Sequence, residues 1–273
     1  MNIILTGGHT GIGFELTKRL MHEGHHLGLI IRSEKRKQEV IEHLGAGEQL
    51  DFFYADLSVQ QDVVRVAKEI QAKWDQVDIL FNNAGVLLDG LYTSAQGNEM
   101  HYEVNTLAPY LLTLHLKPLL DASTNPKVVT TVTGSMHSRK EFDIDGLLKP
   151  KKFVKLFGSY LQSKVGATVL MNDLAKQWPH ISFANVNPGP NKTNMTGNKE
   201  SMPGLLLIFR NLFFPGPEKG GAYLYDAAFK PEFQGQSGIF IDEKKVKPMQ
   251  YALDEASRAH LLSGLVESTT APA

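Results

Sequence analysis

The chain has 273 residues, no Pro- or Ser-rich linker and 21% charged residues, so we expect one domain over residues 1–273 with an ordinary soluble composition. A formal net charge of −1 gives no electrostatic reason to expect a nucleic-acid partner, and the absence of cysteine excludes disulfides, thiolate metal sites and a cysteine nucleophile. The first residues lack the basic leader of a signal peptide and no apolar run reaches the length of a membrane span, so we predict a cytoplasmic protein without a membrane span.

Short apolar runs alternate with longer stretches of helical period along the chain. The predicted strands are Asn2–Leu5, Leu27–Ile31, Leu50–Ala55, Val77–Phe81, Lys127–Val132, Ile181–Val186 and Gly238–Ile241. The predicted helices span residues 11–24, 33–44, 58–74, 97–120, 157–177 and 217–229. Because the strands are continuously apolar, both faces of the sheet should be covered. The alternation predicts an α/β fold with a doubly wound, parallel seven-stranded sheet that binds ligands at the carboxyl ends of its strands.

The first strand leads into the Gly-rich stretch TGGHTGIG, residues 6–13, which opens a helix. Glycines allow a tight turn in which backbone N–H groups approach a pyrophosphate, and the positive end of the helix favours that charge. A plain strand-to-helix turn is the alternative, but the position after the first strand favours a cofactor turn. The residues expected at the cofactor here are Gly7, His9, Thr10, Gly11, Ile12 and Gly13.

The second strand ends in Arg32, and Lys35 and Arg36 follow within one helical turn. An NAD site usually needs an acidic residue at this position for the ribose 2′-hydroxyl, whereas the 2′-phosphate of NADP needs a cation. We therefore predict NADP in preference to NAD, with Arg32 and Lys35 at the phosphate. The alternative to a phosphate site is a solvated basic helix face. That interpretation accounts for Lys37 and extends to Arg36.

The third strand is followed by Asp56 and Leu57. A carboxylate there could accept a hydrogen bond from an adenine amino group while the leucine packs on the ring. An equally good interpretation makes Asp56 the N-cap of the next helix.

Five motifs at strand ends or the following helix start, TGGHTGIG, ADLS, NNAG, YLQSK and NPGPNKT, occur in an order similar to that of the short-chain dehydrogenase/reductase family. The resemblance runs from residue 2 to about residue 195 and continues more weakly to about residue 248. Thr10 stands where the sugar-nucleotide epimerase branch would need glycine, so the chain resembles the oxidoreductase branch. The resemblance implies a Rossmann fold, carbonyl–alcohol chemistry and further cofactor contacts from Asn83, Ala84, Gly85, Pro188, Gly189 and Thr193.

Tyr160 and Lys164 are four residues apart on a predicted helix, which places them on one face, one turn apart. Chance gives about 0.6 such pairs in a chain of this composition, so the spacing alone is weak support. A lysine ammonium near a phenol favours the phenolate and lowers its pKa toward a range useful for proton transfer. Because their helix follows the fifth strand, across the carboxyl end of the sheet from the Gly-rich turn, we predict a catalytic pair.

The family resemblance implies two further catalytic residues. The segment after the fifth strand offers Thr133, Ser135 and Ser138, and Ser135 best matches the family serine that orients the substrate oxygen. Asn105 matches the helix asparagine that joins the proton relay through water. The implied mechanism is hydride transfer between the nicotinamide and a carbonyl carbon, with Tyr160 exchanging the proton on oxygen.

The 24 residues between Ser135 and Tyr160, together with SGIFIDEKKVKP near the C-terminus, resemble the branch of retinol dehydrogenases and protochlorophyllide reductases. The absence of cysteine argues against the photochemical reductases. The bulky apolar segment 196–220 falls where the family has a substrate lid, which predicts an apolar aldehyde, ketone or alcohol as substrate.

Three other properties are predicted with alternatives left open. Segment 196–220 is either a lid that also touches a membrane surface, or a helix packed on the core or on another subunit of a homo-oligomer. The histidines show no ligand spacing, so no metal is assigned. A catalytically silent NADP(H)-binding regulator is the alternative to an enzyme, and the retention of both Tyr160 and Lys164 favours the enzyme.

Overall fold

The computed structural model describes residues 1–134, 142–197, 199–202, 204–249 and 251–270. An eight-stranded sheet in the order β3-β2-β1-β4-β5-β6-β7-β8 organises them, and all neighbouring strands are parallel except the antiparallel pair β7 and β8. The strands are β1 (Asn2–Thr6), β2 (His26–Ile31), β3 (Leu50–Tyr54), β4 (Ile79–Asn82), β5 (Lys127–Thr131), β6 (Ser182–Asn187), β7 (Ile239–Asp242) and β8 (Lys245–Lys247). The order reverses between β1 and β4, which is the switch point of a doubly wound fold.

The seven predicted parallel strands are confirmed, with ends within two residues of the predicted ones. The eighth strand, β8, was not predicted because its sequence KVK is short, charged and exposed at every position. It follows a tight turn in which Glu243 adopts a φ of 56°. Such a short, lysine-bearing strand is a common way to close the edge of a sheet.

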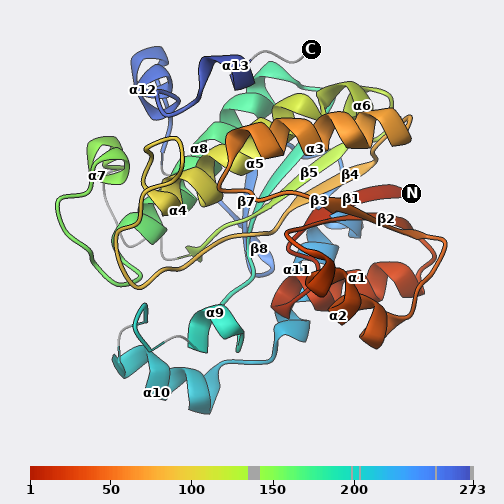
Figure 1. Cartoon of the computed structure of the whole chain (residues 1–273), viewed down its shortest axis with the longest axis horizontal. Helices are drawn as coiled ribbons and strands as arrows, with labels where there is room; N and C mark the ends of the chain where they lie inside the picture. Colours follow the sequence, from red (N-terminus) through yellow and green to blue (C-terminus); the bar gives the residue numbers. More distant parts are fainter. Residues whose placement is uncertain (135–141, 198, 203, 250, 271–273) are drawn as a thin grey trace.

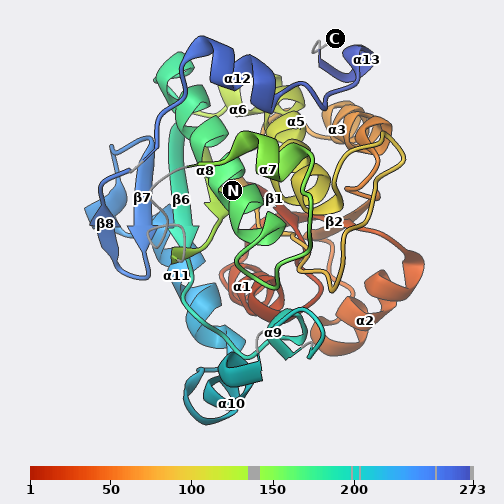
Figure 2. The same ribbon diagram turned by 90° about the vertical axis from the view of Figure 1, so that its left-hand side faces the viewer.

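Helices cover both faces of the sheet (Figures 1 and 2). One face packs against α1 (Gly11–His22), α2 (Glu34–Leu44) and α11 (Pro217–Phe229). The other packs against α3 (Gln60–Lys73), α5 (Ala108–His115) and α8 (Ser159–Gln177). The shorter helices are α4 (Met100–Tyr102), α6 (Lys117–Asp121), α7 (Ile144–Leu148), α9 (Asn194–Gly197), α10 (Gly204–Phe213), the 3₁₀-helix η3 (Pro231–Phe233), α12 (Glu255–Leu261) and α13 (Glu267–Thr270). Two apolar cores, one on each face, fix the sheet and thereby its carboxyl edge.

The helical segment predicted at residues 97–120 is helical over most of residues 100–121, but it is not one regular α-helix. The structure contains α4, the π-helix η1 (Glu103–Leu107), α5 and α6 in succession. Pro109 and Pro118 stand near the starts of α5 and α6, and a proline lacks the N–H that would continue the preceding helix. Single π-turns inside helices frequently mark functional sites, and this one contains Asn105.

Candidate active site

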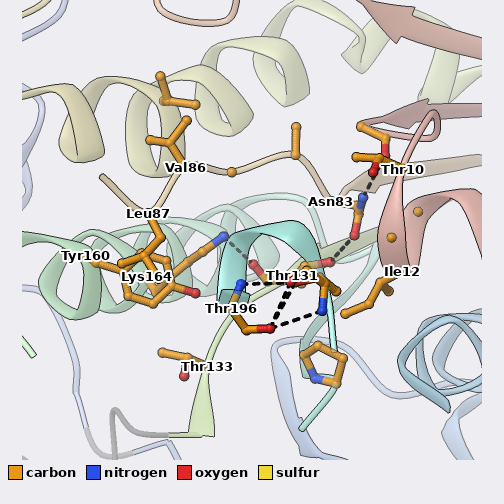
Figure 3. A pocket seen from close by; sticks show the side chains of 18 of the residues that line it. Thr10, Ile12, Asn83, Val86, Leu87, Thr131, Thr133, Tyr160, Lys164 and Thr196 are labelled. Carbon is orange, nitrogen blue, oxygen red and sulfur yellow. Dashed lines mark hydrogen bonds between the residues drawn. The ribbon is translucent and has the colours of Figure 1, made fainter. Parts of the chain in front are cut away.

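A cavity of about 1210 Å³ lies at the carboxyl edge of the sheet, where β1, β2, β4, β5 and β6 end. Most of the residues predicted from sequence to bind the cofactor line it. They are Gly7, His9, Thr10, Gly11, Ile12, Gly13, Arg32, Asp56, Leu57, Asn83, Ala84, Gly85, Tyr160, Lys164, Pro188, Gly189 and Thr193. Figure 3 shows part of this lining.

The Gly-rich turn between β1 and α1 has little room for side chains at its glycine positions. Gly7 and Gly11 have φ values of +70° and +55°, in the left-handed region that favours glycine. A Cβ on Gly13 would lie 2.2 Å from the carbonyl oxygen of Gly7. The hydroxyl of Thr17 donates to the carbonyls of Gly8 and Gly13 at 3.0 and 2.9 Å, which fixes the turn to α1. The backbone is thus left bare at a helix N-terminus, as an anionic pyrophosphate requires.

Asn83 joins the ends of three strands beneath this turn. Its Nδ2 donates to the carbonyl of Thr6 at 3.1 Å, and its Oδ1 accepts from the hydroxyl of Thr131 at 3.3 Å. The hydroxyl of Thr6 in turn accepts the N–H groups of Asn83 and Ala84 at 3.0 and 2.9 Å. The NNAG segment therefore sets the distance between the Gly-rich turn and the β4 and β5 ends.

Two arginines lie at the end of the cavity next to β2. Arg32 and Arg36 line it, and Arg36 forms an ion pair with Glu39 at 2.7 Å. Burial, followed by the charge of Arg36, lowers the pKa of His9 in the same wall. Lys35, which was predicted to bind the phosphate, is exposed and does not line the cavity. Arg36, which the sequence left open as part of a solvated basic face, lines the cavity. The positive charge here suits a phosphate group.

Asp56 lines the cavity but does not cap α3. Its Oδ1 accepts hydrogen bonds from the N–H and hydroxyl of Ser58 at 2.9 and 2.7 Å, and the residue before α3 is Val59. The N-cap interpretation of Asp56 was therefore wrong, because the turn between β3 and α3 is three residues longer than that interpretation assumed. A carboxylate oxygen remains at the cavity wall for another donor.

Tyr160 and Lys164 project from the first two turns of α8 into the cavity (Figure 3). The Lys164 Nζ donates to the carbonyl of Thr131 at the end of β5, at 2.9 Å. Burial raises the pKa of Tyr160 to about 12 and lowers that of Lys164 to about 8. In this pocket desolvation therefore outweighs the expected lowering of the phenol pKa, and the phenol keeps its proton at neutral pH.

Asn105 lies behind the pair and does not line the cavity. Its Oδ1 accepts the N–H of Val86 at 2.8 Å, and its Nδ2 donates to the carbonyl of Val86 and the hydroxyl of Ser163, both at 3.0 Å. A Cβ on Gly85 would lie 3.0 Å from both Asn105 Oδ1 and Lys164 Nζ, so only glycine lets these two side chains approach the loop after β4.

The predicted catalytic serine, Ser135, and its alternative Ser138 lie outside the described residues. The two residues that precede Ser135, Thr133 and Gly134, line the cavity.

The turn after β6 closes the cavity opposite the Gly-rich turn. Asn191 Nδ2 donates to the carbonyls of Pro188 and Gly189 at 2.9 Å each. A Cβ on Gly11 would lie 3.3 Å from the methyl of Thr193, so the two turns touch. Their contact brings together motifs that are about 180 residues apart.

The other end of the cavity is apolar, and most of its residues were not identified from sequence. They are Val86, Leu87, Leu88, Met100, Val104, Leu156, Phe157, Met202 and Phe214. Met202 and Phe214 belong to segment 196–220, which was predicted as a lid over the substrate. The run VLLDG directly after NNAG was the available signal, because the residues that follow β4 must also face the carboxyl edge.

Comparisons with known proteins agree with this arrangement. The family model for short chain dehydrogenases matches residues 1–204. Polyprenol dehydrogenase from Homo sapiens is 26% identical over 284 aligned positions, covering 97% of this chain and 84% of that protein. Salutaridine reductase from Papaver somniferum has a similar structure, with a TM-score of 0.67, 21% identity and coverage of 88% of this chain and 99% of that one. A short chain dehydrogenase from Shigella flexneri complexed with NADP has a TM-score of 0.68, 20% identity and coverage of 89% and 96%.

Proposed function

Because the chain belongs to the short-chain dehydrogenase family of oxidoreductases, we propose that it uses NADP(H) to interconvert an apolar aldehyde or ketone and the corresponding alcohol. The observation that carries this proposal is the position of Tyr160 and Lys164. Both side chains line the cavity that the Gly-rich turn also lines. A dinucleotide bound on that turn and a proton donor would therefore lie in one cavity.

Each residue has a distinct part in the proposed chemistry. A bound nicotinamide supplies or accepts the hydride. The Tyr160 hydroxyl is protonated at neutral pH and gives its proton to the carbonyl oxygen during reduction. Lys164 stabilises the phenolate that remains, and Ser135 orients the reacting oxygen. The fourth member of the proposed Ser-Tyr-Lys-Asn relay is Asn105, whose side chain holds the loop that carries Val86 and which would join the relay through water.

An apolar substrate is supported by the far end of the cavity. Beyond Tyr160 the walls consist mainly of aliphatic, methionine and phenylalanine side chains, with Asp89 and Tyr92 at the margin. Ligand pockets of this kind gain affinity from burial and use few polar groups for orientation. A relative named as a polyprenol dehydrogenase, whose name indicates an alcohol substrate, is consistent with this chemistry. The first test is oxidation of NADPH and of NADH with a panel of apolar aldehydes and ketones that includes retinal.

Cofactor preference is expected to depend on Arg32. Arg32→Ala should weaken NADPH binding about 10- to 100-fold, because it removes a charge-assisted contact with the 2′-phosphate, and should leave NADH binding unchanged. Cofactor fluorescence titration measures both affinities. Lys35→Ala is the matched control, since this neighbouring lysine does not line the cavity. An unchanged NADPH affinity in Arg32→Ala would refute the phosphate assignment, and a larger loss in Lys35→Ala would transfer it to Lys35.

NADPH binding is also expected to weaken as the pH rises through the pKa of Lys164, which burial lowers to about 8. Below that pH the ammonium is charged and attracts the anionic cofactor, whereas above it the amine is neutral. Between pH 7 and 9 the affinity should fall up to about tenfold. Lys164→Met should bind more weakly and show no such pH dependence. If the wild type and Lys164→Met showed the same pH dependence, a group other than Lys164 would be responsible. His9 would not be that group, because burial lowers its pKa below the ordinary value and so away from this pH range.

A further inference from the structure

Several large apolar side chains are exposed around the open, apolar end of the cavity. Ile208 and Leu212 of α10 are 61% and 69% exposed, and they lie on one face of the helix because they are four residues apart. Phe213 is 70% exposed. In both ribbon views α10 lies at the margin of the molecule, away from the sheet (Figures 1 and 2). Folding alone gives no reason for these side chains to face water.

A basic segment is bonded to the residues that precede this helix. Residues 149–158, KPKKFVKLFG, contain four lysines and no acidic residue. All four lysines are exposed, and so are Val154, which lies between two of them, and Phe157, which follows the last. The two aspartates just before the segment are engaged within the protein, because Asp143 caps α7 and Asp145 pairs with His260 at 2.7 Å.

Both segments border the same opening. Leu156 and Phe157 line the cavity from one side, and Met202 and Phe214, which flank α10, line it from the other. The Lys155 Nζ donates to the carbonyl of Lys199 at 3.2 Å, which joins the two segments directly. The exposed lysines and apolar side chains therefore form one rim, defined here as residues 149–158 and the described residues of 190–214, which are 190–197, 199–202 and 204–214.

The rim has a charge opposite to that of the rest of the chain. Its described side chains include six lysines and one acidic residue, a net charge of +5, whereas the whole chain has −1 and the remainder therefore −6. A surface that combines lysines with exposed leucine, isoleucine and phenylalanine is typical of interfacial membrane binding. A second copy of the chain would bring two rims of charge +5 face to face, which is unfavourable.

We propose that this rim docks on an anionic lipid membrane, with α10 inserted at the headgroup level and the cavity opening toward the bilayer. The interaction goes beyond the proposed oxidoreductase function and does not depend on it. Such docking lets an apolar compound pass between the bilayer and the cavity without crossing water. Among the described residues no helix combines the length and hydropathy that a membrane crossing requires, so the contact is peripheral.

Vesicle flotation with the full chain, without cofactor or substrate, tests the proposal. We expect binding to vesicles of phosphatidylcholine with about one third phosphatidylserine, little binding to phosphatidylcholine alone, and weaker binding at high salt. Substitution of Lys149, Lys151 and Lys152 by glutamine should weaken binding about 100-fold, at about fivefold per lysine. A double Ile208→Ser, Leu212→Ser variant should also lose binding while its melting temperature remains close to that of the wild type, since both side chains are exposed.

The matched control replaces three exposed lysines on other elements, Lys18, Lys68 and Lys176, by glutamine, and should bind like the wild type. Equal loss in this control would overturn the assignment to the rim, because binding would then reflect overall charge. A folded wild type that ignores anionic vesicles would overturn the proposal. Light scattering gives a further outcome that would overturn the proposal. If the wild type were a dimer that does not bind vesicles, and the Ile208→Ser, Leu212→Ser variant were a monomer, the rim would bind a second copy of the chain.

Discussion

Tyr160→Phe is expected to lower the rate of carbonyl reduction about 10³-fold and to leave the affinity for NADPH within about twofold of the wild type. The substitution removes one hydroxyl and retains the ring, whose edge packs against the imidazole of His101 with a centroid distance of 6.3 Å. No other change to the cavity is required. The loss should appear in kcat and in kcat/KM for the carbonyl equally, because the proton is transferred only in the transition state.

Tyr92→Phe is the matched control for this experiment. Tyr92 lines the same cavity, but its hydroxyl donates to the exposed carboxylate of Asp89 at 2.7 Å, at the margin of the apolar end. We expect its activity to stay within about threefold of the wild type. If Tyr160→Phe retained more than a tenth of wild-type activity, Tyr160 would not be the proton donor. If both variants and the wild type were inactive on a broad panel yet bound NADPH, the silent regulator would become the better interpretation.

The fold was predictable because its signals are local. Continuous apolar runs such as those of β1, β4 and β5 identify strands that are covered on both faces, and glycine and polar residues mark where each strand ends. The predicted order of elements was confirmed for this reason. The break of the 97–120 helix into four pieces was missed because a π-turn has no sequence signal of its own, although Pro109 and Pro118 marked where hydrogen bonding could change.

Most of the residues predicted at the cofactor lie around one cavity, because most of them directly follow a strand whose end must reach the carboxyl edge, and their contact with a cofactor stays a prediction. Arg36 and Lys35 show the limit of that reasoning. Both follow Arg32 within a turn, and only the direction of α2 decides that Arg36 faces the cavity while Lys35 faces water. The apolar end is formed by segments far apart in sequence, since Leu156 and Met202 both line it, and no periodicity encodes how such segments come together.

Gly13→Ala should abolish useful cofactor binding, with NADPH affinity lowered about 100-fold, although the substitution adds a single methyl group. The added Cβ would lie 2.2 Å from the carbonyl oxygen of Gly7 and 2.5 Å from Asn83 Nδ2. Both atoms are fixed, since Asn83 joins the ends of β1, β4 and β5, so the turn itself must shift. Overpacking of this kind costs about 1–3 kcal/mol, and 3 kcal/mol corresponds to slightly more than 100-fold in affinity.

The variant Gly47→Ala separates this steric effect from the general effect of replacing glycine. Gly47 precedes β3, and a Cβ there would meet nothing closer than 3.7 Å, which is ordinary contact. Its NADPH affinity should therefore equal that of the wild type, as measured by fluorescence titration. Circular dichroism should show that Gly13→Ala keeps its secondary structure, because the clash is confined to the turn. Normal NADPH binding by a folded Gly13→Ala would mean that the dinucleotide does not lie on this turn, and the assignment of the cavity as the cofactor site would have to be abandoned.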